Sequence, residues 1–181
     1  MIGWLVDRYR GLFPAQAPSC VEPPDHASRT RIGYDPTQIA HFKAHHAKLR
    51  RLLEELARCT LQRRYDAICN ALTAFSGELA RHLLDENVRL YAYLKHCQQG
   101  DADGADFARF MQIESGRIGR AVSTFARSYS RSGVSDANIE MFSTELGAVA
   151  NALLNRIRIE ESLLYPMYMA PVPDSTRNVA A

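Results

Sequence analysis

The chain has 181 residues, of which 46% are hydrophobic and 23% charged, as in an ordinary globular domain with one sizeable core. Twenty-two lysines and arginines against twenty acidic residues leave a formal net charge of +2. The basic residues are spread along the predicted helices rather than clustered in one segment, and this argues against a nucleic-acid-binding protein.

The first 36 residues are predicted to form an arm that precedes the main body. Residues 1–13 form a short amphipathic segment, and residues 14–36 hold five of the eight prolines. The apolar face of the segment is expected to pack on the body or on a second copy in a homodimer, with a membrane-surface anchor as the alternative. The segment lacks the pattern of a signal peptide, and a cytoplasmic location is therefore expected. No apolar run approaches the roughly 18 residues of a membrane span, so we expect no integral membrane protein.

Helical periodicity begins at Thr37 and continues to about Met169, without a strand-like alternation of useful length. Asp35 followed by Pro36 indicates a helix start. Proline fits the first helical position, and an aspartate directly before it can accept hydrogen bonds from the free N–H groups of the first turn. The first helix is expected to end near Arg58.

Three further helices follow, separated by short turn sequences. The second helix is expected over residues 61–97, and the third runs from the turn at 101–104 to a break at 132–133. The fourth starts at a cap formed by Ser135 or Asp136. Four long helices with short connections predict an all-α fold, an antiparallel up-down-up-down four-helix bundle over residues 37–169 with a flexible tail at 170–181.

Polar side chains interrupt the core-facing stripe of each predicted helix. Residues at alternating spacings of three and four face the axis of such a bundle. On the second helix the stripe skips one step near Arg89 and Leu90. The stripes are apolar except at His46 on the first helix, His82 and Glu86 on the second, Glu114 on the third, and Arg156 and Glu160 on the fourth.

We expect these six side chains to meet. A buried charge without a partner is costly, so four unrelated interruptions of one core are not expected. The pair on the second helix and the pair on the fourth helix each have an i, i+4 spacing, which stacks two side chains on one face. Imidazole and carboxylate ligands inside a bundle are the usual construction of non-heme iron sites.

Three segments resemble motifs of the hemerythrin-like HHE family, over roughly residues 37–168. Residues 45–56 (HHAKLRRLLEEL) resemble its first-helix motif, in which His46 is followed by leucines three, six and seven positions later. Residues 82–91 (HLLDENVRLY) resemble its HxxxE motif, and residues 156–166 (RIRIEESLLYP) resemble its fourth-helix HxxxEE motif. The resemblance implies a hemerythrin-like bundle with a non-heme iron site, commonly di-iron, that binds oxygen, senses oxygen or nitric oxide, or handles iron.

Two positions depart from the family pattern. Arg156 stands where the family has its fourth-helix histidine, and arginine has no lone pair to donate because it stays protonated. Ser115 stands where the family has its third-helix histidine. Glu114, directly before it, is expected to substitute as an oxygen ligand.

Two hypotheses about the site follow. In the first, His46, His82, Glu86, Glu160 and Glu114 bind iron in a site of reduced nuclearity, and the protein binds iron or senses O2, NO or redox state. In the second, the bundle is metal-free, and the Arg156 guanidinium replaces the cation by bridging carboxylates. The protein is then a regulatory or protein-interaction module. A full di-iron site with unfamiliar ligands is a third arrangement. No catalytic constellation is readable, so we predict no enzyme activity beyond oxidase-like or peroxidase-like side chemistry at a bound iron.

Overall fold

The computed structural model describes residues 33–97 and 102–169, so the predicted amphipathic segment, most of the arm and the tail lie outside the described residues. The described part is helical. Its main helices are α2 (Gln38–Leu61), α3 (Tyr65–Asp85), α5 (Ala102–Ser132) and α6 (Ile139–Ile159). Helix α3 continues into the π-helix η1 (Glu86–Tyr91) and α4 (Ala92–Cys97), and α6 continues into the π-helix η2 (Glu160–Leu164) and the 3-10 helix η3 (Tyr165–Met167).

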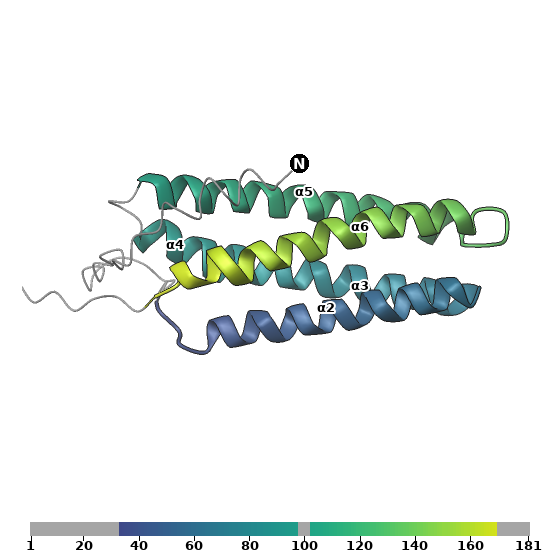
Figure 1. Cartoon of the computed structure of the whole chain (residues 1–181), viewed down its shortest axis with the longest axis horizontal. Helices are drawn as coiled ribbons and strands as arrows, with labels where there is room; N and C mark the ends of the chain where they lie inside the picture. The colour runs from purple at the N-terminus through teal and green to yellow at the C-terminus, as the bar shows by residue number, and fades with distance from the viewer. Residues whose placement is uncertain (1–32, 98–101, 170–181) are drawn as a thin grey trace, which may run out of the picture.

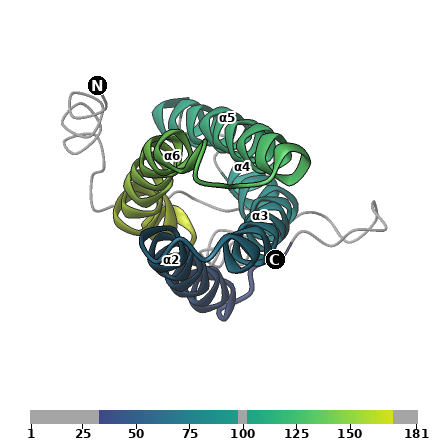
Figure 2. The same cartoon turned by 90° about the vertical axis from the view of Figure 1, so that its right-hand side faces the viewer.

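The helices form four rods that lie side by side, and successive rods along the chain run in opposite directions (Figure 1). Viewed from one end, they stand at the corners of a square (Figure 2). Helix α2 packs against α3 and α6, and α5 packs against the same two helices from the opposite corner. The predicted all-α, up-down-up-down four-helix bundle is therefore confirmed. None of the described helices combines the length and the apolar character that a membrane crossing needs.

The first helix starts close to the predicted position. The Asp35 carboxylate accepts hydrogen bonds from the backbone N–H (2.9 Å) and the hydroxyl (2.7 Å) of Thr37, so it satisfies a donor at the helix start. The helix runs on to Leu61, past the predicted end near Arg58, and the second helix begins at Tyr65 rather than at residue 61. Between them Arg63 adopts a left-handed conformation with φ of 52°, which reverses the chain.

The fourth helix begins later than predicted. It starts at Ile139 after Asn138, so neither Ser135 nor Asp136 is its cap. The Asp136 carboxylate instead accepts hydrogen bonds from Arg63 Nη1 and the Tyr65 hydroxyl, both at 2.6 Å. These bonds tie the α5–α6 turn to the α2–α3 turn at the same end of the bundle, and this tertiary contact outweighs local capping.

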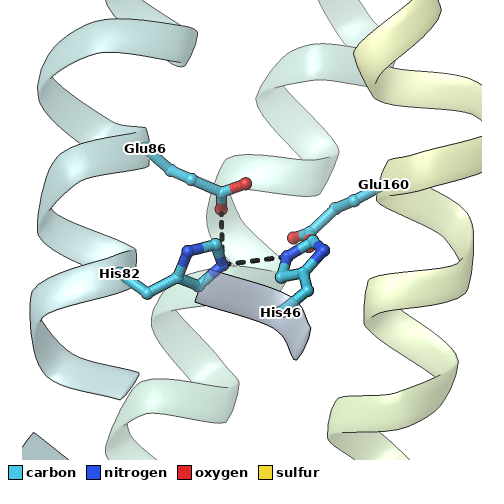
Figure 3. Close-up of side chains that lie close together, drawn as sticks. All are labelled: His46, His82, Glu86 and Glu160. Carbon is cyan, nitrogen blue, oxygen red and sulfur yellow. Dashed lines mark hydrogen bonds and ion pairs between the residues drawn. The ribbon is translucent and has the colours of Figure 1, made fainter. Parts of the chain in front are cut away.

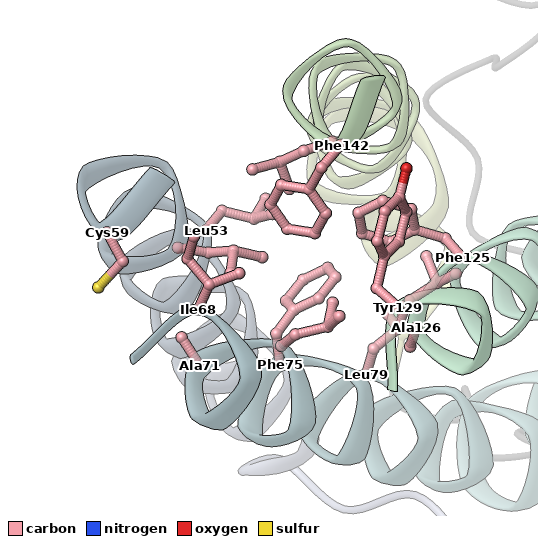
Figure 4. Packing of buried hydrophobic residues seen from close by; sticks show 14 of the residues in the cluster. Leu53, Cys59, Ile68, Ala71, Phe75, Leu79, Phe125, Ala126, Tyr129 and Phe142 are labelled. Carbon is pink, nitrogen blue, oxygen red and sulfur yellow. The ribbon is translucent and has the colours of Figure 1, made fainter. Parts of the chain in front are cut away.

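The bundle core consists of two apolar clusters. The larger lies near the α2–α3 and α5–α6 turns, where Phe75, Phe125 and Phe142 pack between the helices (Figure 4). The smaller lies at the opposite end and includes Phe42 and Phe107. Burial of a side chain of this size contributes roughly 1.5–3 kcal/mol relative to exposure. The polar core residues lie between the two clusters along each helix.

Both π-helices begin at a polar core residue, Glu86 in one case and Glu160 in the other. A π-turn holds one residue more than an α-turn, so the side chains that follow shift by one position. This shift explains why the apolar stripe of the second helix skips a step near Arg89 and Leu90. The two π-helices therefore mark the level of the polar layer.

Candidate metal centre

Four side chains from three rods converge in the polar layer (Figure 3). His46 lies on α2 between the buried Phe42 and Leu49, and His82 lies in the last turn of α3. All four are closed off from solvent, with exposed fractions of 0% for His46, 1% for His82, 0% for Glu86 and 1% for Glu160. The structure thus brings together four of the five predicted ligands.

The donor atoms of these side chains point at one another. His46 Nε2 lies 3.1 Å from His82 Nε2 and 3.2 Å from Glu160 Oε2, and His82 Nε2 lies 3.8 Å from Glu86 Oε2. One donor atom from each of the four lies within 4.8 Å of those of the other three. Donors that share one ion at about 2.1 Å lie roughly 3–4 Å apart, so this spacing fits a single metal ion.

The orientation of His46 is set by a residue outside the predicted site. Its Nδ1 lies 2.8 Å from Glu161 Oε1, which also accepts a hydrogen bond from Arg50 Nη2 at 3.0 Å. A carboxylate accepts only, so Nδ1 donates a proton to Glu161, and Nε2 is the nitrogen that would give its lone pair to a metal. Carboxylates hold metal-binding histidines in this way. Sequence reasoning missed Glu161, although it is the second acidic residue of the HxxxEE-like segment.

Tyr165 closes one side of the cluster. Its hydroxyl donates to Glu86 Oε1 at 2.9 Å and lies 3.1 Å from His46 Nε2. Its ring stacks on the His46 imidazole with centroids 5.5 Å apart and an angle of 10° between the planes. The tyrosine therefore restrains both an imidazole and a carboxylate.

Two buried polar atoms of the clustered side chains have no hydrogen-bond partner within the described part of the chain. They are Glu86 Oε2 and His82 Nδ1, and both are buried. Such atoms are rare in native proteins because each costs about 1–3 kcal/mol of desolvation. A cation at the centre of the cluster would satisfy the free Glu86 oxygen, so the donor set fits a metal.

Burial controls the protonation of the cluster. It lowers the pKa of His82 to about 4, so this imidazole is neutral. Burial also raises the pKa of Glu86 well above its usual range, and the nearby Glu160 charge raises it further. Burial alone would raise the pKa of Glu160 as well, but the charge of Arg156 and the His46 hydrogen bond outweigh it, and the pKa falls to about 2. Without a metal, Glu160 is therefore the ionised carboxylate of the two, and burial favours the neutral form of Glu86.

Arg156 lies beside the cluster and faces the third helix. Its Nε donates to Glu160 Oε1, its Nη2 donates to the Tyr91 hydroxyl and to Ser115 Oγ (2.7 Å), and its Nη1 donates to Met111 Sδ at 3.2 Å. Burial alone would lower the pKa of Arg156, but the surrounding acidic groups raise it, so the guanidinium keeps its charge. The two positions that depart from the HHE pattern, Arg156 and Ser115, thus bind each other.

The prediction that Glu114 faces the core is wrong. Its side chain is 26% exposed and pairs with Arg117 on the same helix. Ser115 takes the core-facing position instead, four residues after the buried Met111. The polar layer therefore has no carboxylate from α5 among the described residues.

Comparison with known proteins gives one result that covers most of the chain. The family model of the hemerythrin HHE cation binding domain matches residues 37–168, which include all four clustered donors. No match was found among curated proteins or among solved structures.

Proposed function

Because this chain belongs to the hemerythrin HHE cation-binding domain family, we propose that its bundle holds one non-heme iron ion through His46, His82, Glu86 and Glu160. One observation carries the proposal. Four buried donors from three rods converge on one point, and one carboxylate oxygen among them has no other partner within the described residues. Two imidazoles and two carboxylates form a donor set suited to iron.

The charges of the polar layer favour one ion over two. With Glu86 ionised, the two carboxylates and the Arg156 guanidinium carry one net negative charge, and Glu161 is already paired with Arg50. One divalent ion turns this into one net positive charge. A second ion would add two more positive charges in a region closed to water, where unpaired charge is costly.

Arg156 is proposed to take the place of a second cation. It supplies a fixed positive charge to Glu160 Oε1 and leaves Glu160 Oε2 directed at His46 Nε2. Its hydrogen bond to Ser115 fills the gap on α5 where the family pattern has a histidine. The paired departures thus convert a site for two metals into a site for one.

We infer that the site binds a diatomic gas or responds to redox state. Bound iron supplies a redox-active centre with affinity for O2 or NO. The chain supplies the environment: Glu161 holds the proton on His46 Nδ1, and the Tyr165 hydroxyl donates to Glu86 Oε1 and so restrains this carboxyl group. The apolar clusters on both sides exclude water, and exclusion of water suppresses side reactions at such a site.

A metal-free regulatory bundle is the competing function. The complete hydrogen bonding of Arg156 favours it, because the guanidinium neutralises Glu160 without any ion. The free Glu86 oxygen disfavours it.

The deciding experiment loads the metal-free protein with Fe2+ without oxygen, removes unbound iron and adds NO. We expect close to one iron per chain and an NO-dependent change in the visible spectrum. Glu86→Gln should lose both signals, and the exposed control Glu54→Gln should keep them. Wild-type protein that retains no iron would support the metal-free bundle.

A further inference from the structure

A second group of side chains that could hold a metal spans α2 and α3, next to the core cluster but with no donor residue in common with it. His41 and His45 occur one helical turn apart on α2, and Asp85 is the last residue of α3, which packs against α2. We propose that His41, His45 and Asp85 form a surface site for a divalent transition-metal ion, separate from the core site.

The geometry of these three residues suits one shared ion. The two imidazole rings lie 4.3 Å apart between centroids, and His41 Nε2 lies 3.8 Å from Asp85 Oδ2. One donor atom from each of the three residues lies within 4.8 Å of those of the other two. A separation of 3.8 Å is too long for a hydrogen bond but close to the roughly 3.4 Å between two tetrahedral ligands of one ion.

His45 provides an independent observation that points to a ligand. Its side chain is 8% exposed, and its buried Nδ1 has no hydrogen-bond partner within the described residues. The nearest acidic oxygen to this nitrogen, on Glu78, is 4.0 Å away, and Glu78 is already bound by Lys48 at 2.7 Å and by Arg81 at 2.6 Å. A buried imidazole nitrogen without a partner is costly unless an ion or a water molecule binds it.

Access to the site differs from access to the core. The His41 side chain is 46% exposed and Asp85 is 28% exposed, so an ion can arrive from solvent without opening the bundle. The His45 ring lies beside His82, with centroids 5.9 Å apart, but the two groups share no donor residue. The surface site can therefore fill whether or not the core binds iron.

The donor types decide which ions the site selects. Two imidazoles with one carboxylate favour Zn2+, Ni2+ or Cu2+, whereas Mg2+ and Ca2+ prefer oxygen ligands alone. An i, i+4 pair on one helix is held rigid by the backbone, and Asp85 adds a negative charge from a neighbouring helix. Three protein ligands leave at least one position for water or another ligand.

The test uses Ni2+ and the full chain carrying Glu86→Gln, which removes a core ligand while keeping the size of the side chain. Calorimetry should detect one Ni2+ per chain at this site. His41→Ala and Asp85→Asn, each added separately, should weaken binding at least about tenfold, as loss of metal-site interactions does elsewhere. Lys43→Ala, an exposed substitution on the same helix, should leave binding unchanged.

Each alternative result overturns the assignment. If Ni2+ still binds to the His41→Ala variant, the ion lies elsewhere. If His41→Ala removes binding but Asp85→Asn leaves it unchanged, the site is a pair of histidines rather than a three-ligand site. If Glu86→Gln does not fold, the wild-type protein is titrated with Zn2+ and histidine ring resonances are followed by NMR. His41 and His45 must then shift together, with the shift of His45 lost in His41→Ala.

Discussion

Arg156 and Ser115 lie where the resemblance to the HHE motifs predicts histidines, and they act as a pair. The guanidinium donates to side chains on η1, α5 and η2, so each of its nitrogen atoms has a hydrogen-bond partner inside the bundle. At the residue scale, we expect this charge, rather than the shape of the cavity, to limit the number of ions.

The first prediction concerns Arg156→His. An imidazole can donate a lone pair where a guanidinium cannot, and the change also removes a positive charge, so bound iron should rise above the wild-type value. Elemental analysis after expression in iron-rich medium measures it. Arg158→His, an exposed substitution on the same helix, is the control. Equal iron in the Arg156 variant and in wild type would show that this residue does not occupy a ligand position.

The second prediction concerns the free energy of unfolding of Glu86→Gln. Burial favours the neutral form of Glu86 in the metal-free protein, so the neutral amide should change metal-free stability at pH 7 by no more than about 1 kcal/mol. Iron should no longer stabilise the variant, because stabilisation by a ligand requires binding to the folded state. Urea unfolding with and without Fe2+ tests both parts, and a metal-free variant destabilised by several kcal/mol would contradict them.

Residue-level sequence reasoning identified the central donors because a charge on an apolar stripe needs an explanation. His46, His82, Glu86 and Glu160 were all found in this way. Glu114 was misplaced because, after Met111, a step of three reaches Glu114 and a step of four reaches Ser115, and local spacing allows both.

Side chains that approach the cluster from outside the stripes could not be predicted from periodicity. Glu161 and Tyr165 are separated from His46 by more than one hundred residues, and their contacts depend on how the fourth rod turns at η2. The same limit applies to His41, His45 and Asp85, because their approach depends on how α2 packs on α3. Tertiary geometry decides such contacts.

At the scale of elements, the two π-helices shift the side chains that follow Glu86 and Glu160 by one position. The extra residue of η1 lies in a segment where Val88 is 61% exposed. An interrupted stripe near Arg89 and Leu90 was the sequence signal for it.

The third prediction is that deletion of Val88 is tolerated far better than deletion of Ala74 in the regular part of α3. Removing a residue from an α-helix rotates everything beyond it by about 100°, which turns the apolar face away from the core. Removing one from a π-helix restores an α-turn and keeps both flanks in register. Thermal unfolding should show a cooperative transition for the Val88 deletion, at a higher temperature than for the Ala74 deletion. Equal destabilisation by the two deletions would contradict this view of η1.

The fourth prediction concerns the contact between α2 and α3 through Glu78. Burial raises the pKa of this carboxyl, but hydrogen bonds from Lys48 and Arg81 outweigh burial and lower it. The folded pKa is thus below the unfolded one, so the stabilisation is complete above the unfolded value of about 4.3 and is lost as the pH falls through the folded pKa.

Glu78→Gln should therefore cost about 1 kcal/mol at pH 7, because both cationic partners are more than half exposed and solvent screens them. The difference from wild type should vanish under acidic conditions. Urea unfolding at a series of pH values measures it, and a difference that grows on acidification would mean that the folded pKa of Glu78 lies above the unfolded one.

At the scale of the whole molecule, one polar layer separates two apolar clusters in a bundle of four rods. The architecture could be predicted because four long helical patterns joined by short turns leave few ways to bury their apolar faces. The helix starts near residues 65 and 139 could not be predicted from the sequence. Contacts between the two turns, such as Asp136 with Tyr65, determine where each helix begins.

The central claim is that this bundle binds one iron ion, with Arg156 in the place of a second. The most direct test is elemental analysis of the wild-type protein after anaerobic loading with Fe2+ and removal of loosely bound metal, with the His41→Ala variant measured alongside to exclude the surface site. We predict close to one iron per chain in both proteins. Two irons per chain, or none, would contradict the claim.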